Sequence, residues 1–139
     1  MFLKRLIYIS RVTMPATPHA LQRLHALSER SNRQLDITGA LGFTGRYFIQ
    51  CIEGRTDAID ALMLRIQADT RHADVVELCT ITAEQRQFDQ WSMRYFASHS
   101  LDDDVHQVHQ AGHRDPERAQ WLIDRMTQSL QPGHSLYRR

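Results

Sequence analysis

The chain has 139 residues, with 17 Lys+Arg against 16 Asp+Glu, so its net charge is only +1 and its length fits one compact domain. Its 42% hydrophobic residues can bury a core, which excludes a disordered or fibrous chain. A charge balance this even provides no overall field for binding a nucleic acid or an anionic membrane.

Apolar stretches and cysteines indicate the compartment. The longest apolar stretch near the start, 6–9, is far shorter than the roughly 20 residues that span a bilayer or the roughly 7 to 15 of a signal-peptide core. Cys51 and Cys79 form no C-x-x-C pair and suit a reducing compartment, where thiols act as small core residues. We therefore expect a cytoplasmic protein without a disulfide.

The chain begins with a predicted strand and helix. Residues 3–10 are rich in β-branched and aromatic types, which is typical of a strand. Thr17 can cap the helix that follows, and Pro18 suits its first position. An apolar stripe of leucines carries this helix to about residue 31.

A hairpin and a second helix come next. Two apolar runs, 37–43 and 47–52, are joined by a short connection in which Gly45 can supply a positive φ. Residues 56–69 then have apolar side chains at a period of 3.6, which predicts a helix.

The remaining segments predict two strands and a helical C-terminal region. The predicted elements are strands over 75–81 and 91–97, a short helix over 101–108, a helix over 116–130 and a frayed tail over 132–139.

The resulting order, βαββαββ, predicts an α+β protein with a ferredoxin-like sheet and two helices on one face. Its first and third strands would be central neighbours, which places Tyr8 beside Gln50. The C-terminal helices need a partner and would cover the second face. We expect a sheet domain over 1–98, a helical extension over 99–131 and a flexible tail over 132–139.

Gln50 is the most informative single residue. Strand alternation places it on the helix side of the sheet, where an unpaired amide costs roughly 1 to 3 kcal/mol. Tyr8 is the nearest partner, and one phenol cannot satisfy a whole carboxamide. Asn32 could reach the same space. Two interpretations stay open: a polar ligand between the helices, or a plain Tyr–Gln pair completed by backbone or water.

Five segments in register resemble the motifs of the BLUF family of blue-light sensors using flavin: 6–10, 31–32 with 37–41, 48–54, 65–72 and 86–93. The resemblance covers about residues 3–96. Two departures are modest: Ser31 stands where many members have Asn or His, and Cys51 where Val or another apolar residue is common.

The resemblance implies a flavin between the two helices, FAD first, with FMN or riboflavin as alternatives. Tyr8 would donate an electron and a proton, and Gln50 would bridge the phenol to flavin N5 and C4=O. Rotation or tautomerisation of this amide would produce a red-shifted light state. The other residues implied to contact the cofactor are Ser31, Asn32, Ile37, Arg65, Ile66, Asp69, Arg71 and His72. Without the resemblance, the charged end of the second helix reads as a solvated terminus with an Arg65–Asp69 pair.

Trp91 and Met93 are the implied signal relay. They lie two apart on the predicted fifth strand, so they would share a face and could exchange positions near Gln50. The alternative is that both are ordinary core residues.

Three C-terminal histidines, His106, His109 and His113, could share a helix face, but we expect no metal site there. Three-histidine sites need outer partners and a dry wall, and Gly112 would interrupt the helix.

We therefore expect a short stand-alone photoreceptor that is not an enzyme. It would signal to an unidentified downstream protein or through a change of homo-oligomer, without nucleic acid or membrane. The alternative is an RNA-recognition-type module with the same element order, but its C-terminal helix would cover the base-stacking face. A small hydrolase is a third possibility, and no nucleophile and base pair stands at a credible spacing.

Overall fold

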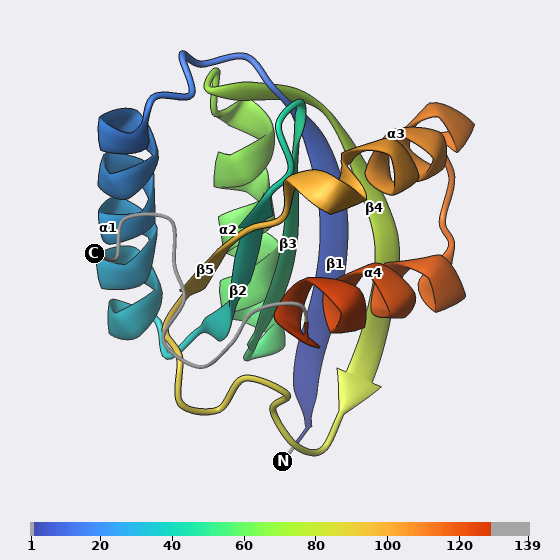
Figure 1. Ribbon diagram of the computed structural model, residues 1–139. Helices are drawn as coiled ribbons and strands as arrows, with labels where there is room; N and C mark the ends of the chain where they lie inside the picture. Colours follow the sequence, from blue (N-terminus) through green and yellow to red (C-terminus); the bar gives the residue numbers. More distant parts are fainter. Residues whose placement is uncertain (1, 129–139) are drawn as a thin grey trace.

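The computed structural model describes residues 2–128 and forms one sheet with helices on both faces (Figure 1). Its elements are, in order, β1 (Leu3–Val12), α1 (Pro18–Gln34), β2 (Thr38–Phe43), β3 (Tyr47–Gly54), α2 (Thr56–Ala68), β4 (His72–Ala83), β5 (Arg94–Ala97), the 3-10 turn η1 (His99–Leu101), α3 (Asp102–Ala111) and α4 (Pro116–Gln128). None of the helices within 2–128 combines the length and the apolar character needed to span a bilayer.

The strand order, β4-β1-β3-β2-β5, confirms the predicted ferredoxin-like α+β fold. β1 and β3 are central and antiparallel, and their register sets Tyr8 directly opposite Gln50. β5 extends the sheet at its far edge, parallel to β2.

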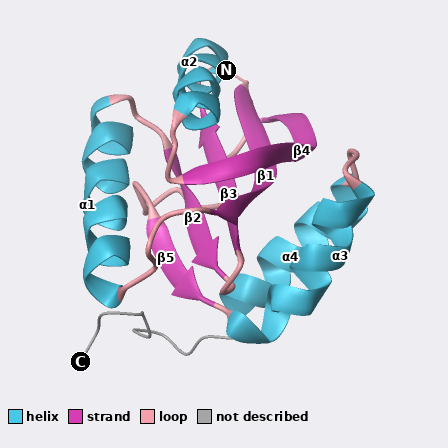
Figure 2. Cartoon of the chain, turned by 90° about the horizontal axis from the view of Figure 1, so that it is seen from above, coloured by secondary structure: helices cyan, strands magenta, loops and turns pink. Residues whose placement is uncertain are grey.

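The two faces of the sheet carry separate hydrophobic clusters. α1 and α2 cover one face, and α3 and α4 cover the other (Figure 2). On β3, Phe48 and Ile52 belong to the cluster under α1 and α2, whereas Ile49 and Cys51 belong to the cluster that includes α3 and α4. The face with Ile7, Ile9, Ile49 and Cys51 is therefore buried, as predicted, and offers no open platform for stacking bases.

The fifth strand differs from its prediction, because it begins at Arg94 rather than at residue 91. The Trp91 N–H donates to the Phe88 carbonyl at 3.2 Å, so the chain turns here before it extends. Side chains alternate only along an extended chain, and Trp91 and Met93 consequently lie on opposite faces: Trp91 stacks on Phe88, whereas Met93 joins the cluster under α1 and α2. The prediction that they share a face is wrong.

Two helices have bounds that differ from the predicted ones. α1 continues past the predicted end near residue 31 to Gln34, and α3 runs over Asp102–Ala111 rather than 101–108. Gly112 ends α3 with a φ of 73° instead of interrupting it. Thr17 caps α1 as predicted. The predicted end of the last helix at 130 and the tail over 132–139 lie outside the described residues.

The backbones of β2 and β3 approach each other closely at Gly39. A Cβ there would lie 2.0 Å from the Cys51 carbonyl oxygen, whereas a Cβ at Gly42 would meet the flexible Met126 Sδ at 2.1 Å. We expect Gly39→Ala to lower the free energy of unfolding by about 3 kcal/mol, and Gly42→Ala by about 1 kcal/mol. The Met126 side chain can move away from a new methyl group at position 42, whereas the Cys51 backbone cannot move away from one at position 39. Urea unfolding measures both, and equal losses would contradict this ranking.

Candidate functional site

A cavity of about 350 Å³ lies against the sheet and is lined from both α1 and α2, within the size range of small-molecule sites. All the residues predicted to contact a cofactor line it except Ile37, namely Tyr8, Ser31, Asn32, Gln50, Arg65, Ile66, Asp69, Arg71 and His72. Ile37 is buried in the same hydrophobic cluster, where its side chain lies beside Gly54.

The walls of the cavity are largely apolar. The wall residues are Leu24 and Leu27 of α1, Leu62 and Ile66 of α2, and Leu41 and Phe48 of the sheet. Leu27 is 50% exposed, so an apolar side chain stands at the rim. The sequence did not identify six of the lining residues as contacts of a ligand: Leu24, Leu27, Ser28, Leu41, Phe48 and Leu62. Strand alternation does place Phe48 on the same face as Gln50.

Tyr8 and Gln50 form the polar floor. The Tyr8 hydroxyl donates a hydrogen bond to Gln50 Oε1. Gln50 Nε2 donates to Met93 Sδ at 3.5 Å, and a thioether is a weak acceptor, so this buried amide retains donor capacity. Burial, with a smaller contribution from the Asp69 charge, raises the pKa of the Tyr8 phenol, which keeps its proton on the hydroxyl.

α1 holds the segment that presents Met93. Asn32 is buried, and its Nδ2 donates to the Ser92 carbonyl at 3.0 Å. A ring nitrogen of His25, Nε2, lies 2.6 Å from the Met93 carbonyl oxygen. Asn32 therefore has two roles, as a cavity residue and as an anchor for the chain beside Gln50.

Charged residues gather where α2 meets β4. Asp69 bonds with the Arg71 guanidinium, which holds the pKa of this carboxyl below its usual range. The alternative Arg65–Asp69 pair does not form, and Arg65 makes no ion pair with any residue of 2–128. Its cation lines the cavity and can meet an anion.

His72 lines the cavity with its ring. Its Nδ1 bonds with Ser10 Oγ, and its Nε2 lies 2.7 Å from the Ile66 carbonyl oxygen. Because both nitrogens have protein partners, the ring fixes the start of β4 against the end of α2.

Alkaline titration tests the environment of two of the buried phenols, Tyr8 and Tyr95, whose pKa values are raised by burial. The unfolded chain loses such protons near about pH 10, whereas the folded protein keeps them. We therefore expect full stability from these groups below about pH 10, and falling stability as the pH rises further. Tyrosinate absorbance measures the ionisation of the phenols as the pH rises. Tyr8→Phe should remove one of the phenols that ionise last, and an unchanged number of such phenols would contradict the raised pKa of Tyr8.

The three C-terminal histidines have separate surroundings. His106 Nδ1 lies 2.6 Å from the Tyr47 hydroxyl, and His109 Nε2 lies 2.7 Å from the Asp74 carbonyl oxygen. His113 Nδ1 contacts the Arg114 carbonyl at 2.9 Å. They do not converge on one point.

Comparison with known proteins identifies the class that this fold and cavity define. The family model of BLUF, described as sensors of blue-light using FAD, matches residues 3–94. The chain belongs to the BLUF family, and its domain is a flavin-dependent sensor of blue light.

Sequence relatives include much longer proteins. The chain is 36% identical over 92 residues to the photoactivated adenylate cyclase subunit beta of Euglena longa, which covers 66% of this chain and 11% of that protein. It is 31% identical over 112 residues to the blue light- and temperature-regulated antirepressor BluF of Escherichia coli, covering 79% of this chain and 28% of the relative.

Solved structures agree on the architecture. The dark-state structure of the BLUF protein BlrB superposes with a TM-score of 0.74 at 32% identity, covering 92% of this chain and 97% of that one. Klebsiella pneumoniae BlrP1 with FMN and cyclic diGMP gives a TM-score of 0.68 at 30% identity, covering 91% of this chain and 35% of BlrP1. BlsA in its ground state, at 20% identity, shares the fold with a TM-score of 0.78, covering 100% of this chain and 95% of BlsA.

Proposed function

We propose that this chain is a photoreceptor, not an enzyme, that holds FAD non-covalently between α1 and α2 and reports blue light through Tyr8 and Gln50. The observation that carries the proposal is the Tyr8–Gln50 hydrogen bond at the floor of a largely apolar cavity with a cationic end. Apolar walls suit a flat aromatic ring, the spare donor of Gln50 suits its polar edge, and Arg65 suits a phosphate.

A bound flavin would supply absorption of blue light and an acceptor for an electron and a proton. Tyr8 holds the proton, because its raised pKa keeps the phenol neutral. Asn32 and Ser31 contribute polar groups from α1, and Ile66 contributes an apolar contact from α2. Arg65 and Arg71 would hold the ribityl and phosphate groups, together with Asp69 and His72; Asp69 fixes Arg71, and His72 fixes the start of β4 against α2.

The Gln50 amide can act as a two-position switch. In the present orientation, Oε1 accepts from Tyr8 and Nε2 faces Met93. A half-turn of the amide would exchange its oxygen and nitrogen, so the Tyr8 hydroxyl would have to accept rather than donate, and Met93 would lose its donor. Tyr8, Gln50 and Met93 would therefore change together.

An absorption spectrum tests the proposed function directly. Protein purified in the dark should be yellow and should shift reversibly to the red under blue light. Colourless protein that binds no added flavin would overturn the proposal. Mass spectrometry of the released cofactor would separate FAD, FMN and riboflavin; the family description favours FAD, and the BlrP1 structure holds FMN.

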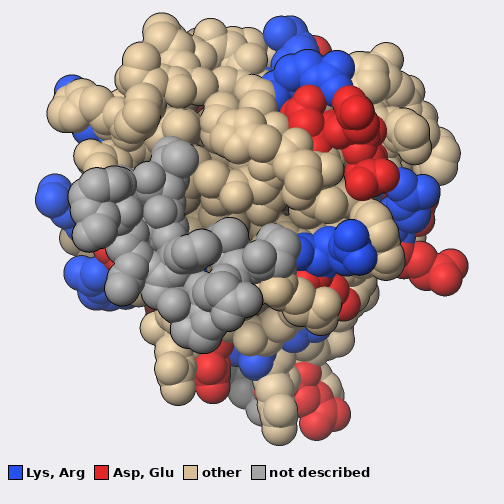
Figure 3. All heavy atoms as spheres, viewed as in Figure 1, with Lys and Arg blue, Asp and Glu red and all other residues tan. Residues whose placement is uncertain are grey.

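The partner that we infer is a separate cytoplasmic protein or a further copy of this chain. The face in Figure 3 mixes positive and negative side chains with uncharged atoms between them, which suits a protein partner better than a nucleic acid. The cyclase and antirepressor relatives carry BLUF segments within longer proteins, which supports output to another protein unit.

Light should alter hydrogen exchange along the path from the cavity to the C-terminal helices. We expect amides of 91–97, α3 and α4 to change their exchange between dark and light, because Met93 reaches Gln50 while Trp91 packs on the opposite cluster. Full-length protein is required, since truncation after residue 98 would expose buried Ile7, Ile9 and Ile49. Identical exchange there, with a change on another surface, would contradict this route.

A further inference from the structure

Glu53 is a buried carboxylate outside the cavity. It stands near the end of β3, three residues after Gln50, and its side chain is 1% exposed. By strand alternation, it points to the α3 and α4 side of the sheet, whereas Gln50 points into the cavity. A buried charge is retained only where it is well paired, so its partners are informative.

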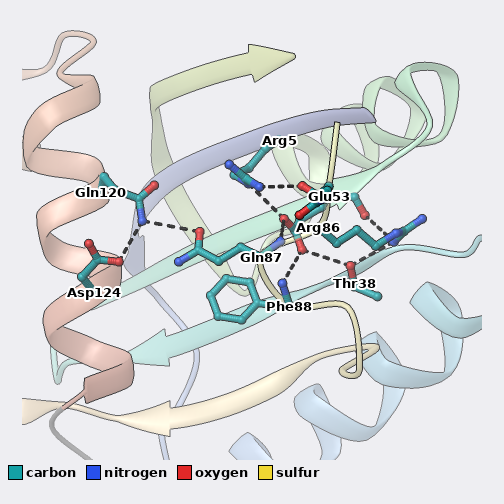
Figure 4. A network of polar contacts seen from close by, with 9 residues as sticks. Arg5, Thr38, Glu53, Arg86, Gln87, Phe88, Gln120 and Asp124 are labelled. Carbon is teal, nitrogen blue, oxygen red and sulfur yellow. Dashed lines mark hydrogen bonds and ion pairs between the residues drawn. The ribbon is translucent and has the colours of Figure 1, made fainter. Parts of the chain in front are cut away.

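The partners of Glu53 come from three parts of the chain (Figure 4). Oε2 accepts from Arg5 Nε at 2.9 Å and from the Gln87 backbone N–H at 2.6 Å. Oε1 accepts from the Phe88 backbone N–H at 2.8 Å and from Thr38 Oγ1 at 3.1 Å. Two consecutive backbone N–H groups are therefore held by one carboxylate.

Those two N–H groups belong to the segment 84–93, which connects β4 to β5 without a helix or strand of its own. Downstream, this segment delivers Met93 to Gln50 Nε2 at 3.5 Å. At Gln87, it reaches α4, because Gln120 Nε2 donates to Gln87 Oε1 at 3.4 Å and to Asp124 Oδ1 at 2.9 Å. Figure 4 shows Gln87 between Glu53 and α4.

We propose that Glu53 is a positioning residue that clamps residues 87–88, and thereby sets Met93 against Gln50 and connects that contact to α4. The significance of this clamp rests on the proposed function of Gln50. The clamp keeps residues 87–88 ordered between the sheet and Gln120 of α4, so a change at Met93 reaches Gln87 and α4 through an ordered segment rather than being absorbed by a loose loop.

Only an acceptor without donors can perform this role. A glutamine at position 53 has one oxygen, and its NH₂ group would face a backbone N–H or the Arg5 guanidinium, which are donors as well. Glu53→Gln should therefore release one of the two backbone groups while keeping the size of the side chain.

Asp102→Asn is the matched control. Asp102 also accepts from a backbone N–H, that of Arg46 at 3.0 Å, and from a threonine hydroxyl, that of Thr44 at 2.7 Å. It anchors α3 to the β2–β3 hairpin, away from 84–93. The control removes a carboxylate with the same kinds of donor, at a side chain that is 20% exposed, without touching the clamp.

The test is made on the full chain without light. In Glu53→Gln, we expect the amides of Gln87 and Phe88 to exchange about ten-fold faster, and the methyl resonance of Met93 to shift while that of Met63 stays in place. Asp102→Asn should change neither. Unchanged exchange in Glu53→Gln, an unmoved Met93 methyl, or equal effects in the control would overturn the proposal.

A milder variant covers the case in which Glu53→Gln does not fold. Thr38→Val keeps the carboxylate, removes one of its donors and also removes the acceptor that Arg86 Nη1 bonds at 2.9 Å, so the Gln87 and Phe88 amides should exchange a few-fold faster. No acceleration would overturn the clamp. These readouts need no flavin, so their failure is separate from failure of the photoreceptor function, which the absorption spectrum detects.

A light-dependent measurement then tests the connection to α4. Flavin-loaded Glu53→Gln should keep its red shift, because Glu53 does not line the cavity, and should lose most of the light-dependent exchange change in α4. Retention of the full α4 response would contradict the transmission through Gln87.

Discussion

Tyr8→Phe should abolish the normal photocycle while the protein still folds. The ring remains, so the hydrophobic cluster is kept, but no O–H is left to supply a proton together with an electron. Loss of the hydrogen bond leaves Gln50 Oε1 without its phenol donor, which should cost about 1 to 3 kcal/mol of stability. The measurement is the yield of the red-shifted state under blue light, together with urea unfolding.

Tyr95→Phe is the matched control for this variant. Tyr95 is a buried phenol of the same cluster on β5, and it does not line the cavity. It should photoactivate as the wild type does. Photoactivation of Tyr8→Phe with the wild-type yield would show that another residue is the donor. Trp91 would be the first to test, although it stacks on Phe88 on the far face of the sheet.

Gln50→Leu should bind flavin and lose the light-induced red shift. Leucine is close in size and keeps the floor of the cavity apolar, but it can neither accept from Tyr8 nor donate to a ligand. The absorption spectrum before and after illumination measures both properties. Gln67→Leu, the same change at an exposed position of α2, should behave as the wild type.

A reversible red shift of normal size in Gln50→Leu would contradict the role of this amide. Loss of both flavin binding and the red shift would instead show that Gln50 contributes to the affinity for flavin rather than to the light response. The two outcomes are distinguished by the cofactor content of the purified protein.

Strong local patterns predicted most of the fold. Three patterns each predicted the element that forms: the β-branched run at the start, the Thr17–Pro18 helix entry and the apolar period of 56–69. The order of the elements then made β1 and β3 neighbours. The opposition of Tyr8 and Gln50 followed from that topology and from alternation. The family motifs added the function that these residues alone left open.

The irregular segment before β5 was not predictable from the sequence. Trp91 and Met93 looked like strand residues, because aromatic and apolar side chains stood at a period of two. The chain over 88–92 is held by Glu53, Gly39 and Asn32, which are distant in the sequence, so no local pattern could reveal its turn. The division of these two residues between the faces of the sheet was therefore missed.

The sequence by itself determined the ferredoxin-like order of elements, the opposition of Tyr8 and Gln50 and the membership of the flavin-dependent light sensors, because these depend on periodicity, on the order of the elements and on local motifs. Only the tertiary structure decided that Arg71 rather than Arg65 neutralises Asp69, that Ile37 is not among the residues lining the cavity, and that Glu53 fixes the segment carrying Met93. Those features arise where side chains from distant segments compete for the same partner, and the outcome of that competition is set by distance and burial in the folded chain.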